Sequence, residues 1–434
     1  MPSDRGPKQN AVVVISAVEI NGVLIETVFR PESRDTALVV ARESGTEVVK
    51  EWKNGKQALV PVGAGNNLIK HRALLLPSAP IEYQDTASLL NEICSYIGCY
   101  VSLSDSATTL SAAYVLLSWV YDAFNELPYL RFRGDYGTGK TRALLVIGSI
   151  CYKAFLASGA STVSPIFHTL DTFKGTLIFD EADFRFTDEK AELVKILNNG
   201  NVRGFPVLRT QVTQKREFDP RAFAIFGPKI VGMRRSYEDR ALESRFLTIE
   251  MEPGQAGVTP INLPDIQQSE ALELRNKLLT YRLRNRLSLR LDASLADPSL
   301  EPRMNQILLP LLSVLPARMR SVISETARSQ QASIVADRSD STEGRVIAIL
   351  NRLRVEGTVS VGDVATAFMV EHGSDYERAI SNRWIGSILR RLNIVLYKSN
   401  GVFVLVPGQD KRIAALAERF GVSPPCPNEN ATPG

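Results

Sequence analysis

The sequence has few of the residues that build metal centres or disulfide bonds. Its 434 residues include four cysteines and three histidines. No zinc-binding or redox spacing relates Cys94, Cys99, Cys151 and Cys426. We therefore expect no metal centre made of protein ligands alone. Reduced, buried thiols are the simpler interpretation, and they are usual in the cytoplasm.

Long apolar runs are also absent. The longest, residues 111–124, includes Asp122 and is shorter than the roughly 20 residues that cross a bilayer. Residues 1–10 are polar and lack the apolar core of a signal peptide. We expect a cytoplasmic protein with no membrane partner.

Neither sign of charge dominates the chain. Lysine and arginine number 51 against 47 acidic residues, which gives a net charge of +4, and 44% of the residues are hydrophobic. This composition is ordinary for a globular protein, and the length allows about two to four domains. The weak positive balance permits a nucleic-acid partner without requiring one.

The most informative segment is glycine-rich and lies between a strand-like run at 129–132 and a helix-like run at 142–151. It matches the phosphate-binding loop pattern G-x-x-x-x-G-K-[ST] at every fixed position and reads Gly134-Asp135-Tyr136-Gly137-Thr138-Gly139-Lys140-Thr141. Such glycines let backbone N–H groups face phosphates, and the helix N-terminus adds its positive end. Lys140 is expected to reach the β- and γ-phosphates of ATP, and Thr141 to bind Mg²⁺. The alternative is an ordinary glycine turn before a helix.

A second motif follows the first. Residues 176–179 form an apolar run, typical of a buried parallel strand, which ends at Asp180 and Glu181. Asp180 is expected to hold the water shell of Mg²⁺, and Glu181 to polarise the attacking water. Taken alone, an apolar strand followed by two carboxylates is usually structural. Behind a complete phosphate loop, the pair indicates binding and hydrolysis of ATP.

The chain is expected to be α/β and to have several parts. These are a small β-rich module at 1–80, a nucleotide-binding core with preceding helices at 81–260, a helical lid and linker at 261–335, a winged-helix domain at 336–422 and a disordered tail at 423–434. The pattern of β-branched residues and turns predicts strands at 11–18, 22–29, 36–41 and 57–62. Apolar spacing predicts helices that begin at Asp85 and helices at 108–124, 271–289 and 304–323, with a polar linker at 332–342.

The C-terminal domain is predicted from three helices followed by a hairpin. The helices are expected at 345–353, 362–369 and 377–392, and the hairpin at 395–405 around an Asn-Gly turn. This order is typical of a winged helix, a helix-turn-helix variant. Candidate DNA contacts are Arg383 and Arg390 on the third helix and Lys398 on the wing. Many winged helices bind proteins instead, so both partners stay open.

With these motifs in this order, residues 85–405 resemble the AAA+ ATPases, and more narrowly the hexameric helicases of the minichromosome-maintenance and superfamily 3 kind. The pattern is most similar to primase–helicases and self-loading helicases of plasmids, phages and integrative elements. The resemblance implies a P-loop core with a helical lid, a homo-oligomeric ring that is typically a hexamer, single-stranded or forked DNA as substrate, and replication proteins as further partners. It does not explain residues 1–80, which fit a DNA-binding collar, a docking surface or the remnant of a larger region.

The resemblance implies a nucleic-acid contact on an inserted hairpin. Residues 198–218 are expected to form this hairpin ahead of a core strand at 222–226. In similar helicases such a hairpin enters the ring channel and touches the nucleic-acid backbone. Arg209, Lys215 and Arg216 are therefore the candidate phosphate contacts. The alternative is a solvated hairpin whose basic residues keep it soluble.

The segment 239–246 resembles the Ser-Arg-Phe segment of AAA+ proteins, whose arginine enters the neighbouring subunit's active site. By that resemblance Arg245 is the arginine finger, with Arg240 in reserve, and its guanidinium would stabilise charge on the γ-phosphoryl group. Pairing with nearby carboxylates is the alternative, above all for Arg240. The family's polar sensor cannot be assigned within 226–232, where Pro228 should disturb a strand. Arg303 is a candidate for the second sensor.

Three functions remain open. The first is an ATP-driven DNA helicase or translocase that serves replication of a mobile element. The second is a helicase loader or replication initiator that uses ATP to assemble on DNA or on a partner. The third is a DNA-binding regulator in which ATP acts as a switch. No primase motif is visible, so priming is not predicted.

Overall fold

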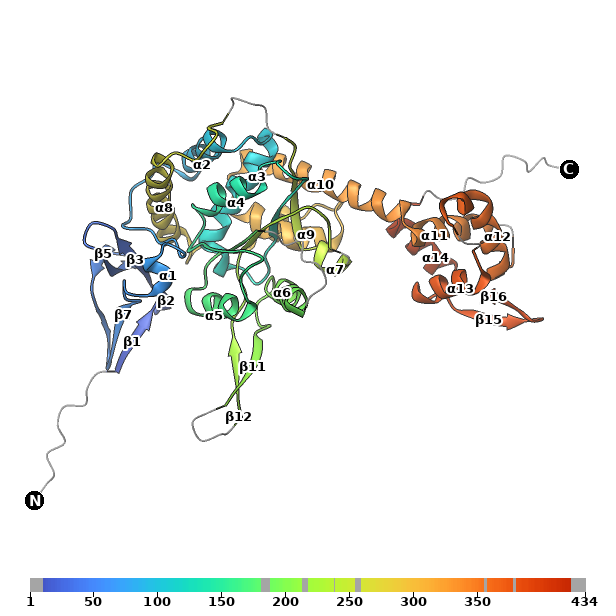
Figure 1. Cartoon of the computed structure of the whole chain (residues 1–434), viewed down its shortest axis with the longest axis horizontal. Helices are drawn as coiled ribbons and strands as arrows, with labels where there is room; N and C mark the ends of the chain where they lie inside the picture. Colours follow the sequence, from blue (N-terminus) through green and yellow to red (C-terminus); the bar gives the residue numbers. More distant parts are fainter. Residues whose placement is uncertain are drawn as a thin grey trace, which may run out of the picture. The chain divides into compact units, whose positions relative to one another are not determined.

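The computed structural model describes residues 11–180, 188–212, 218–237, 239–253, 259–354, 357–377 and 380–422. The chain divides into two compact units, Met1–Ala327 and Arg328–Gly434 (Figure 1). No helix of the described segments is long and apolar enough to cross a lipid bilayer.

The first unit begins with a β module made of two sheets. One is four-stranded and antiparallel, in the order β2-β3-β4-β5, and the other has the order β1-β7-β6 with β1 parallel to β7. The strands are β1 (Ala11–Ile15), β2 (Ala17–Ile20), β3 (Val23–Arg30), β4 (Asp35–Arg42), β5 (Gly45–Val49), β6 (Trp52–Asn54) and β7 (Gln57–Pro61). The predicted strand at 11–18 is two strands that meet at Ser16, and β5 and β6 were not predicted because they are short and largely polar.

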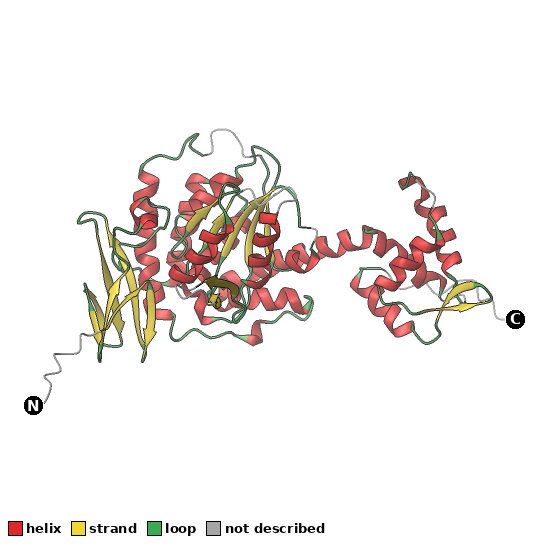
Figure 2. Cartoon of the chain, turned by 60° about the horizontal axis from the view of Figure 1, so that its bottom comes forward, coloured by secondary structure: helices red, strands yellow, loops and turns green. Residues whose placement is uncertain are grey.

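The centre of the first unit is a parallel five-stranded sheet in the order β14-β8-β13-β10-β9. Its strands are β8 (Tyr129–Arg133), β9 (Phe155–Ala157), β10 (Leu177–Phe179), β13 (Lys229–Met233) and β14 (Phe246–Glu250). Helices lie on both faces of this sheet (Figure 2). The three inner strands β8, β13 and β10 are almost completely buried, as expected for parallel strands covered by helices on both faces.

Alternate residues of these strands contact different helices. α4 (Lys140–Gly148) lies on the face that carries Ile178 and Gly232, because a Cβ on Gly148 would meet Ile178 and one on Gly232 would meet Leu144. On the other face, Leu177 and Phe179 join a core with α5 (Val163–Phe173) and α6 (Asp188–Asn199). The sheet is therefore one layer of a three-layer α/β core.

The predicted hairpin exists, but its bounds and the strand after it differ from the prediction. It consists of β11 (Val207–Val212) and β12 (Phe218–Phe223), which pair in antiparallel register, and it projects away from the core in Figure 1. The core strand that follows is β13, so the prediction of a core strand at 222–226 was wrong. That apolar segment partly belongs to the hairpin, and Gly227 and Pro228 separate it from β13 because proline cannot donate in a central strand.

Helices before and after the sheet complete the first unit. α2 (Thr86–Tyr100) begins where predicted, since the Asp85 carboxylate accepts a hydrogen bond from the Ser88 N–H at 2.7 Å. The remaining elements are α1 (Asn67–Lys70), α3 (Asp105–Val120), η1 (Tyr121–Ala123), α7 (Arg240–Glu243), α8 (Ile266–Asn285), η2 (Ala293–Leu295) and α9 (Pro302–Ser313). The predicted helix at 304–323 is interrupted before Pro316, after which α10 (Ala317–Asp340) runs through most of the expected linker at 332–342.

The second unit begins within α10, at Arg328, and its described residues continue with three helices, a two-stranded hairpin and a final helix. These are α11 (Thr342–Leu353), α12 (Val361–His372), α13 (Asn382–Arg391), β15 (Leu396–Ser399), β16 (Val402–Leu405) and α14 (Asp410–Arg419), with η3 (Gly373–Asp375) after α12. The turn at Asn400-Gly401 has two positive φ angles, 47° and 84°, as the pattern predicts. α13 begins at Asn382 and not at 377, because Ser381 caps it through the Trp384 N–H at 3.2 Å.

Candidate functional site: a phosphate-binding pocket

The glycine-rich loop joins the carboxyl end of β8 to α4, and each of its three glycines is required. Gly137 and Gly139 have φ angles of 73° and 88°, which other residues rarely adopt. A Cβ on Gly134 would stand 2.5 Å from the Met251 carbonyl oxygen. The loop therefore has the conformation that the motif predicts, with Gly139 directly before the first turn of α4.

Lys140 lies over the loop that precedes it. Its ammonium donates to the carbonyl oxygens of Gly134 at 2.8 Å and Asp135 at 2.6 Å. The Thr138 hydroxyl donates to the Asp135 carbonyl at 2.9 Å, and the Asp135 carboxylate accepts from the Tyr136 N–H at 2.8 Å. The loop is thus held by its own hydrogen bonds, and a cation stands at its centre.

The two sequence motifs meet in space. The Thr141 hydroxyl donates to the Asp180 carboxylate at 2.7 Å, although 39 residues separate them. Asp180 directly follows β10, and the neighbouring strand supplies Gly232, where a Cβ would stand 3.1 Å from Asp180 Oδ1. Glu181 lies outside the described residues.

These residues line a pocket of about 360 Å³, formed by residues 136–141 with Asp180, Gly232 and Arg234. The donor set fits a magnesium–nucleotide complex. A hydroxyl and a carboxylate lie side by side, which are oxygen ligands of the kind Mg²⁺ takes beside substrate phosphates. Glycine N–H groups, the start of a helix and Lys140 provide the positive environment that phosphates need.

Arg234 belongs to this pocket and was not predicted. It follows β13, and its guanidinium carbon lies 4.0 Å from the centre of the Tyr136 ring. An Arg234 N–H also donates to the Tyr136 hydroxyl. Because the core strand after the hairpin was predicted at 222–226, Arg234 was not considered as the residue that follows this strand. The mostly apolar run at 229–233, followed directly by arginine, could have identified it.

A second cavity, of about 560 Å³, lies beside α4. Leu145 lines it from α4, four residues after Thr141 and therefore on the same face of the helix. Leu263 and Pro264, from the segment after β14, form another wall. Arg142 donates to the carbonyls of Pro260 and Ile261, which fastens this segment to the first turn of α4.

Arg245 lies at the amino ends of the parallel strands, whereas the phosphate loop lies at their carboxyl ends. It directly precedes β14, whereas the loop follows the carboxyl end of the parallel neighbour β8. Its guanidinium donates to the side-chain oxygens of Asn201 at 2.9 Å and Asn198 at 2.6 Å. Burial and the nearby positive charge of Arg245 lower the pKa of Arg303. The structure thus brings Arg245 and Arg303 together and keeps both away from their own chain's phosphate loop.

The predicted nucleic-acid contacts are distributed over both units. Arg209 is on β11, where it forms an ion pair with Glu192 at 2.9 Å. Lys215 and Arg216 lie outside the described residues. In the second unit, Arg383 and Arg390 are exposed on α13, seven residues apart. Arg390 stacks over Phe403, 5.1 Å from the ring centre, and Lys398 pairs with Phe403 across the hairpin.

Comparison with known proteins gave matches among solved structures, while protein-family models and curated proteins gave none. The apo C-terminal region of NrS-1 is 14% identical over 89% of this chain and 96% of that chain, with a TM-score of 0.40. The SCCmec type IV Cch structure, described as an active helicase, is 11% identical over 88% of this chain and 79% of that chain, with a TM-score of 0.39. A full-length MCM homologue from Methanopyrus kandleri is 11% identical over 68% and 67% of the two chains, with a TM-score of 0.35. At TM-scores below 0.5 these similarities carry no weight for function, which has to come from the residues of the site.

Proposed function

We propose that the chain is an ATP-dependent DNA helicase or translocase that acts as a homo-oligomeric ring, a hexamer in the families that its sequence resembles. Its place would be in the replication of a plasmid, phage or integrative element. The observation that carries the ATPase part is the contact of Thr141 with Asp180, because it joins two motifs that are far apart in the sequence. The domain boundaries predicted from the sequence, with a lid and linker at 261–335 and a winged helix at 336–422, belong to this proposal.

In the proposed reaction, Lys140 holds the β- and γ-phosphates, while Thr141 and Asp180 hold Mg²⁺. When bound, Mg²⁺ offsets the charge of the phosphate oxygens during phosphoryl transfer. Glu181, as the residue after Asp180, orients the attacking water. Arg234 takes the place of the polar sensor, since it lines the pocket from the end of the adjacent strand.

We propose that Arg245 acts in the site of a neighbouring copy. Its position at the far edge of the sheet supports this, because the guanidinium is remote from its own phosphate loop. Arg303 strengthens the proposal. The positive charge of Arg245 contributes to the lowered pKa of Arg303, and Glu126, 4.0 Å from Arg303, offsets this in part. The γ-phosphate of an adjacent subunit would be a further anion that stabilises both guanidinium groups.

The nucleoside is proposed to extend from the phosphate loop along α4 to the cavity that Leu145 lines. Helix spacing supports this, since Leu145 is one turn beyond Thr141 on the same face. Leu263 and Pro264 provide apolar surface for a base, which binds in mostly apolar clefts. The fastening of this segment by Arg142 would close the site around the nucleoside.

DNA is proposed to contact the hairpin β11–β12 through Arg209, Lys215 and Arg216, and the winged helix through Arg383, Arg390 and Lys398. The projecting hairpin and the exposed face of α13 support these contacts. Phosphate contacts are indifferent to base sequence and weaken steeply with salt. The hairpin contacts would serve movement of the ring along DNA, and the winged-helix contacts would serve loading of the ring onto DNA.

A strand-displacement assay on forked DNA, with and without ATP, tests the proposal most directly. We expect unwinding that needs ATP, and Lys140→Ala should lower ATP turnover at least about 100-fold, the usual effect of removing a group that stabilises transition-state charge. Replacing Lys215 and Arg216 together should abolish unwinding, whereas replacing Arg383 and Arg390 should impair initial binding. Turnover that survives Lys140→Ala would contradict the site. ATP hydrolysis without unwinding would favour the loader or initiator.

A further inference from the structure

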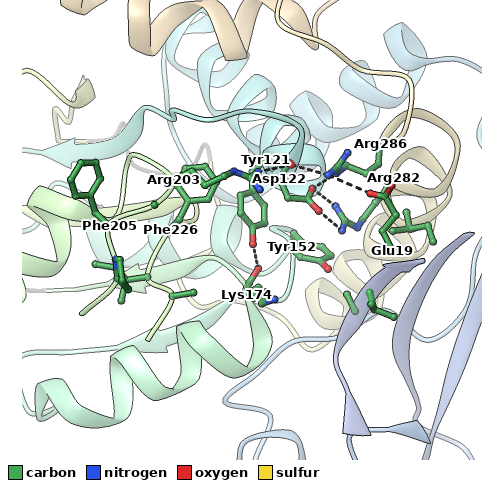
Figure 3. Close-up of a pocket in the computed structure, with 17 residues that line it drawn as sticks. Glu19, Tyr121, Asp122, Tyr152, Lys174, Arg203, Phe205, Phe226, Arg282 and Arg286 are labelled. Carbon is green, nitrogen blue, oxygen red and sulfur yellow. Dashed lines mark hydrogen bonds and ion pairs between the residues drawn. The ribbon is translucent and has the colours of Figure 1, made fainter. Parts of the chain in front are cut away.

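A third cavity, of about 630 Å³, lies at the edge of the central sheet opposite to the phosphate loop (Figure 3). Several of its lining residues directly precede strands of the central sheet in the sequence, whereas the residues of the phosphate loop follow a strand. Tyr121 and Asp122 precede β8, Lys174 precedes β10 and Phe226 precedes β13. In a parallel sheet these positions share one edge, so this cavity is separate from the nucleotide pocket. β2 and β3 of the β module form a further wall.

On one side of the cavity the charges are already paired. Arg282 donates to Glu26 at 2.6 Å and to Asp122 at 2.8 Å. Arg286 has its Nε 2.7 Å from Asp122 and its Nη2 3.8 Å from Glu19. Four of these residues line this side of the cavity, namely Glu19, Asp122, Arg282 and Arg286, and their mutual pairing leaves little charge for a ligand.

The other side carries two cations of a different kind. Arg203 donates to the backbone carbonyls of Asp122 at 2.7 Å and Phe124 at 3.0 Å, which fix its guanidinium without neutralising it. The guanidinium stacks on Phe226, 5.1 Å from the ring centre (Figure 3). Lys174 is exposed nearby on the rim. Among the described residues, no carboxylate forms an ion pair with Arg203 or Lys174.

An exposed aromatic ring accompanies these cations. Phe205 lines the cavity with 59% of its surface exposed, two residues before the hairpin strand β11. An aromatic ring in water beside uncompensated cations is the combination that single-stranded nucleic acids bind, since bases stack on the ring and phosphates meet the cations. Phe205 also lies at the root of the hairpin, close in sequence to the proposed strand contact Arg209 on β11.

We propose that this cavity binds one nucleotide of a single-stranded nucleic acid, with its base stacked on Phe205 and its phosphate contacted by Arg203 and Lys174. The proposal rests on the proposed DNA-dependent function and deepens it. It assigns a strand contact to the hairpin root, outside the basic residues that the sequence indicated. It also gives the β module a function, because β2 and β3 complete the cavity.

Fluorescence anisotropy with a labelled dT20 strand and a non-hydrolysable ATP analogue tests this contact in the full chain. Phe205→Leu, which keeps apolar volume but loses the aromatic face, should weaken binding about 5- to 140-fold, the range for losing one base–aromatic stack. Arg203→Gln should weaken binding and reduce the log–log salt slope by about 0.7. Arg290→Gln is the matched control, since Arg290 is exposed, bonds only to backbone carbonyls of Leu287 and Leu289, and does not line the cavity.

A direct readout comes from Phe205→Trp, whose added fluorescence should be quenched by dT20 when a base stacks on the indole. Binding as in the wild type for Phe205→Leu and Arg203→Gln, with no quenching of the tryptophan, would overturn the inference while the proposed function stands. A wild-type protein that hydrolyses ATP but binds no strand would instead refute the DNA part of that function. If the substitutions leave strand binding intact and shift the oligomeric state in sedimentation, the cavity is a subunit contact, which also overturns the inference.

Discussion

Lys229 is a charged residue that begins the central strand β13 and is completely buried. Its ammonium lies 2.9–3.2 Å from the carbonyl oxygens of Gly200, Ile225 and Gly227, which stand at the two roots of the hairpin segment. A Cβ on Gly200 would come within 2.5 Å of this ammonium, so the lysine needs a glycine there. Burial lowers the pKa of Lys229 to about 7. One side chain thus joins the end of α6, the return of the hairpin and the start of β13.

The lowered pKa predicts a pH-dependent stability. Between about 7 and the ordinary 10.5, the unfolded chain holds a proton that the folded chain does not, so the free energy of unfolding should rise with pH. From pH 7 to pH 8.5 the contribution of Lys229 should be about 1 to 2 kcal/mol. Urea unfolding of the wild type and of Lys229→Met at both pH values gives the change in the free energy of unfolding with pH for each protein. The difference between the two changes is the contribution of Lys229. The comparison with Lys229→Met cancels the titration of thiols, whose ordinary pKa of about 8.5 lies at the top of this window. An equal dependence of the free energy of unfolding on pH in the two proteins would refute the assignment.

Single elements show how short connections position the reactive groups. α7 is one turn long, and the Asp239 carboxylate caps it through the Ala241 N–H at 2.9 Å. Arg131 on β8 holds the end of α7 by two hydrogen bonds to Glu243, of 2.6 and 2.8 Å. Arg245 follows between α7 and β14, and Asn198 and Asn201 fix its guanidinium. A short helix fastened at both ends therefore presents this arginine at the sheet edge.

Arg245→Ala should leave ATP binding unchanged and lower turnover about 10³-fold or more, because an arginine finger acts on the transition state and not on nucleotide affinity. Mixing this variant with Glu181→Gln should restore part of the activity, since some interfaces then combine an intact Glu181 with an intact Arg245. Arg30→Ala, which removes an arginine from a half-exposed pair with Asp35 in the β module, is the control and should turn over ATP normally. Full turnover by a monomer at high dilution would refute action in trans.

At the scale of the whole molecule, a buried ion network joins the β module to the core. Glu26 on β3 is 1% exposed and lies 2.8 Å from the Lys153 ammonium and 2.6 Å from the Arg282 guanidinium. The Tyr152 hydroxyl donates to the same carboxylate at 2.9 Å. One carboxylate of the module thus meets groups of the loop before β9 and of α8. The module is therefore fixed to the first unit and shares its stability.

Glu26→Gln should lower the free energy of unfolding of the first unit by about 3 to 5 kcal/mol, because it leaves the buried Lys153 without a carboxylate and leaves Arg282 paired with Asp122 alone. Urea unfolding followed by tryptophan fluorescence measures this, since Trp52 and Trp119 lie in the module and the core. Glu47→Gln, which breaks the exposed pair with Arg42 in the same module, should change it by less than about 0.5 kcal/mol. Equal effects of the two substitutions would mean that the network does not hold the module.

The sequence by itself determined the features that depend on neighbouring residues. The glycine loop, the cap at Asp85 and the Asn400-Gly401 hairpin follow from local conformational preference, so they were predicted correctly. The break of a predicted helix at Pro316 was local too, and its signal was visible in the sequence. The parallel β10, with Asp180 at its end, followed from an apolar run of strand length.

The tertiary structure alone decided which apolar segment became the core strand after the hairpin and which charged residues were buried. The local sequence pattern could not show whether 222–226 or 229–233 is the core strand, because only the pairing of β13 with β8 and β10 distinguishes the two segments. The contact of Glu26 with Arg282 joins residues 256 positions apart, and no local spacing encodes it. Arg234 and the cavity beside Phe205 are products of the same long-range pairing, since parallel strands bring their ends together from distant parts of the chain.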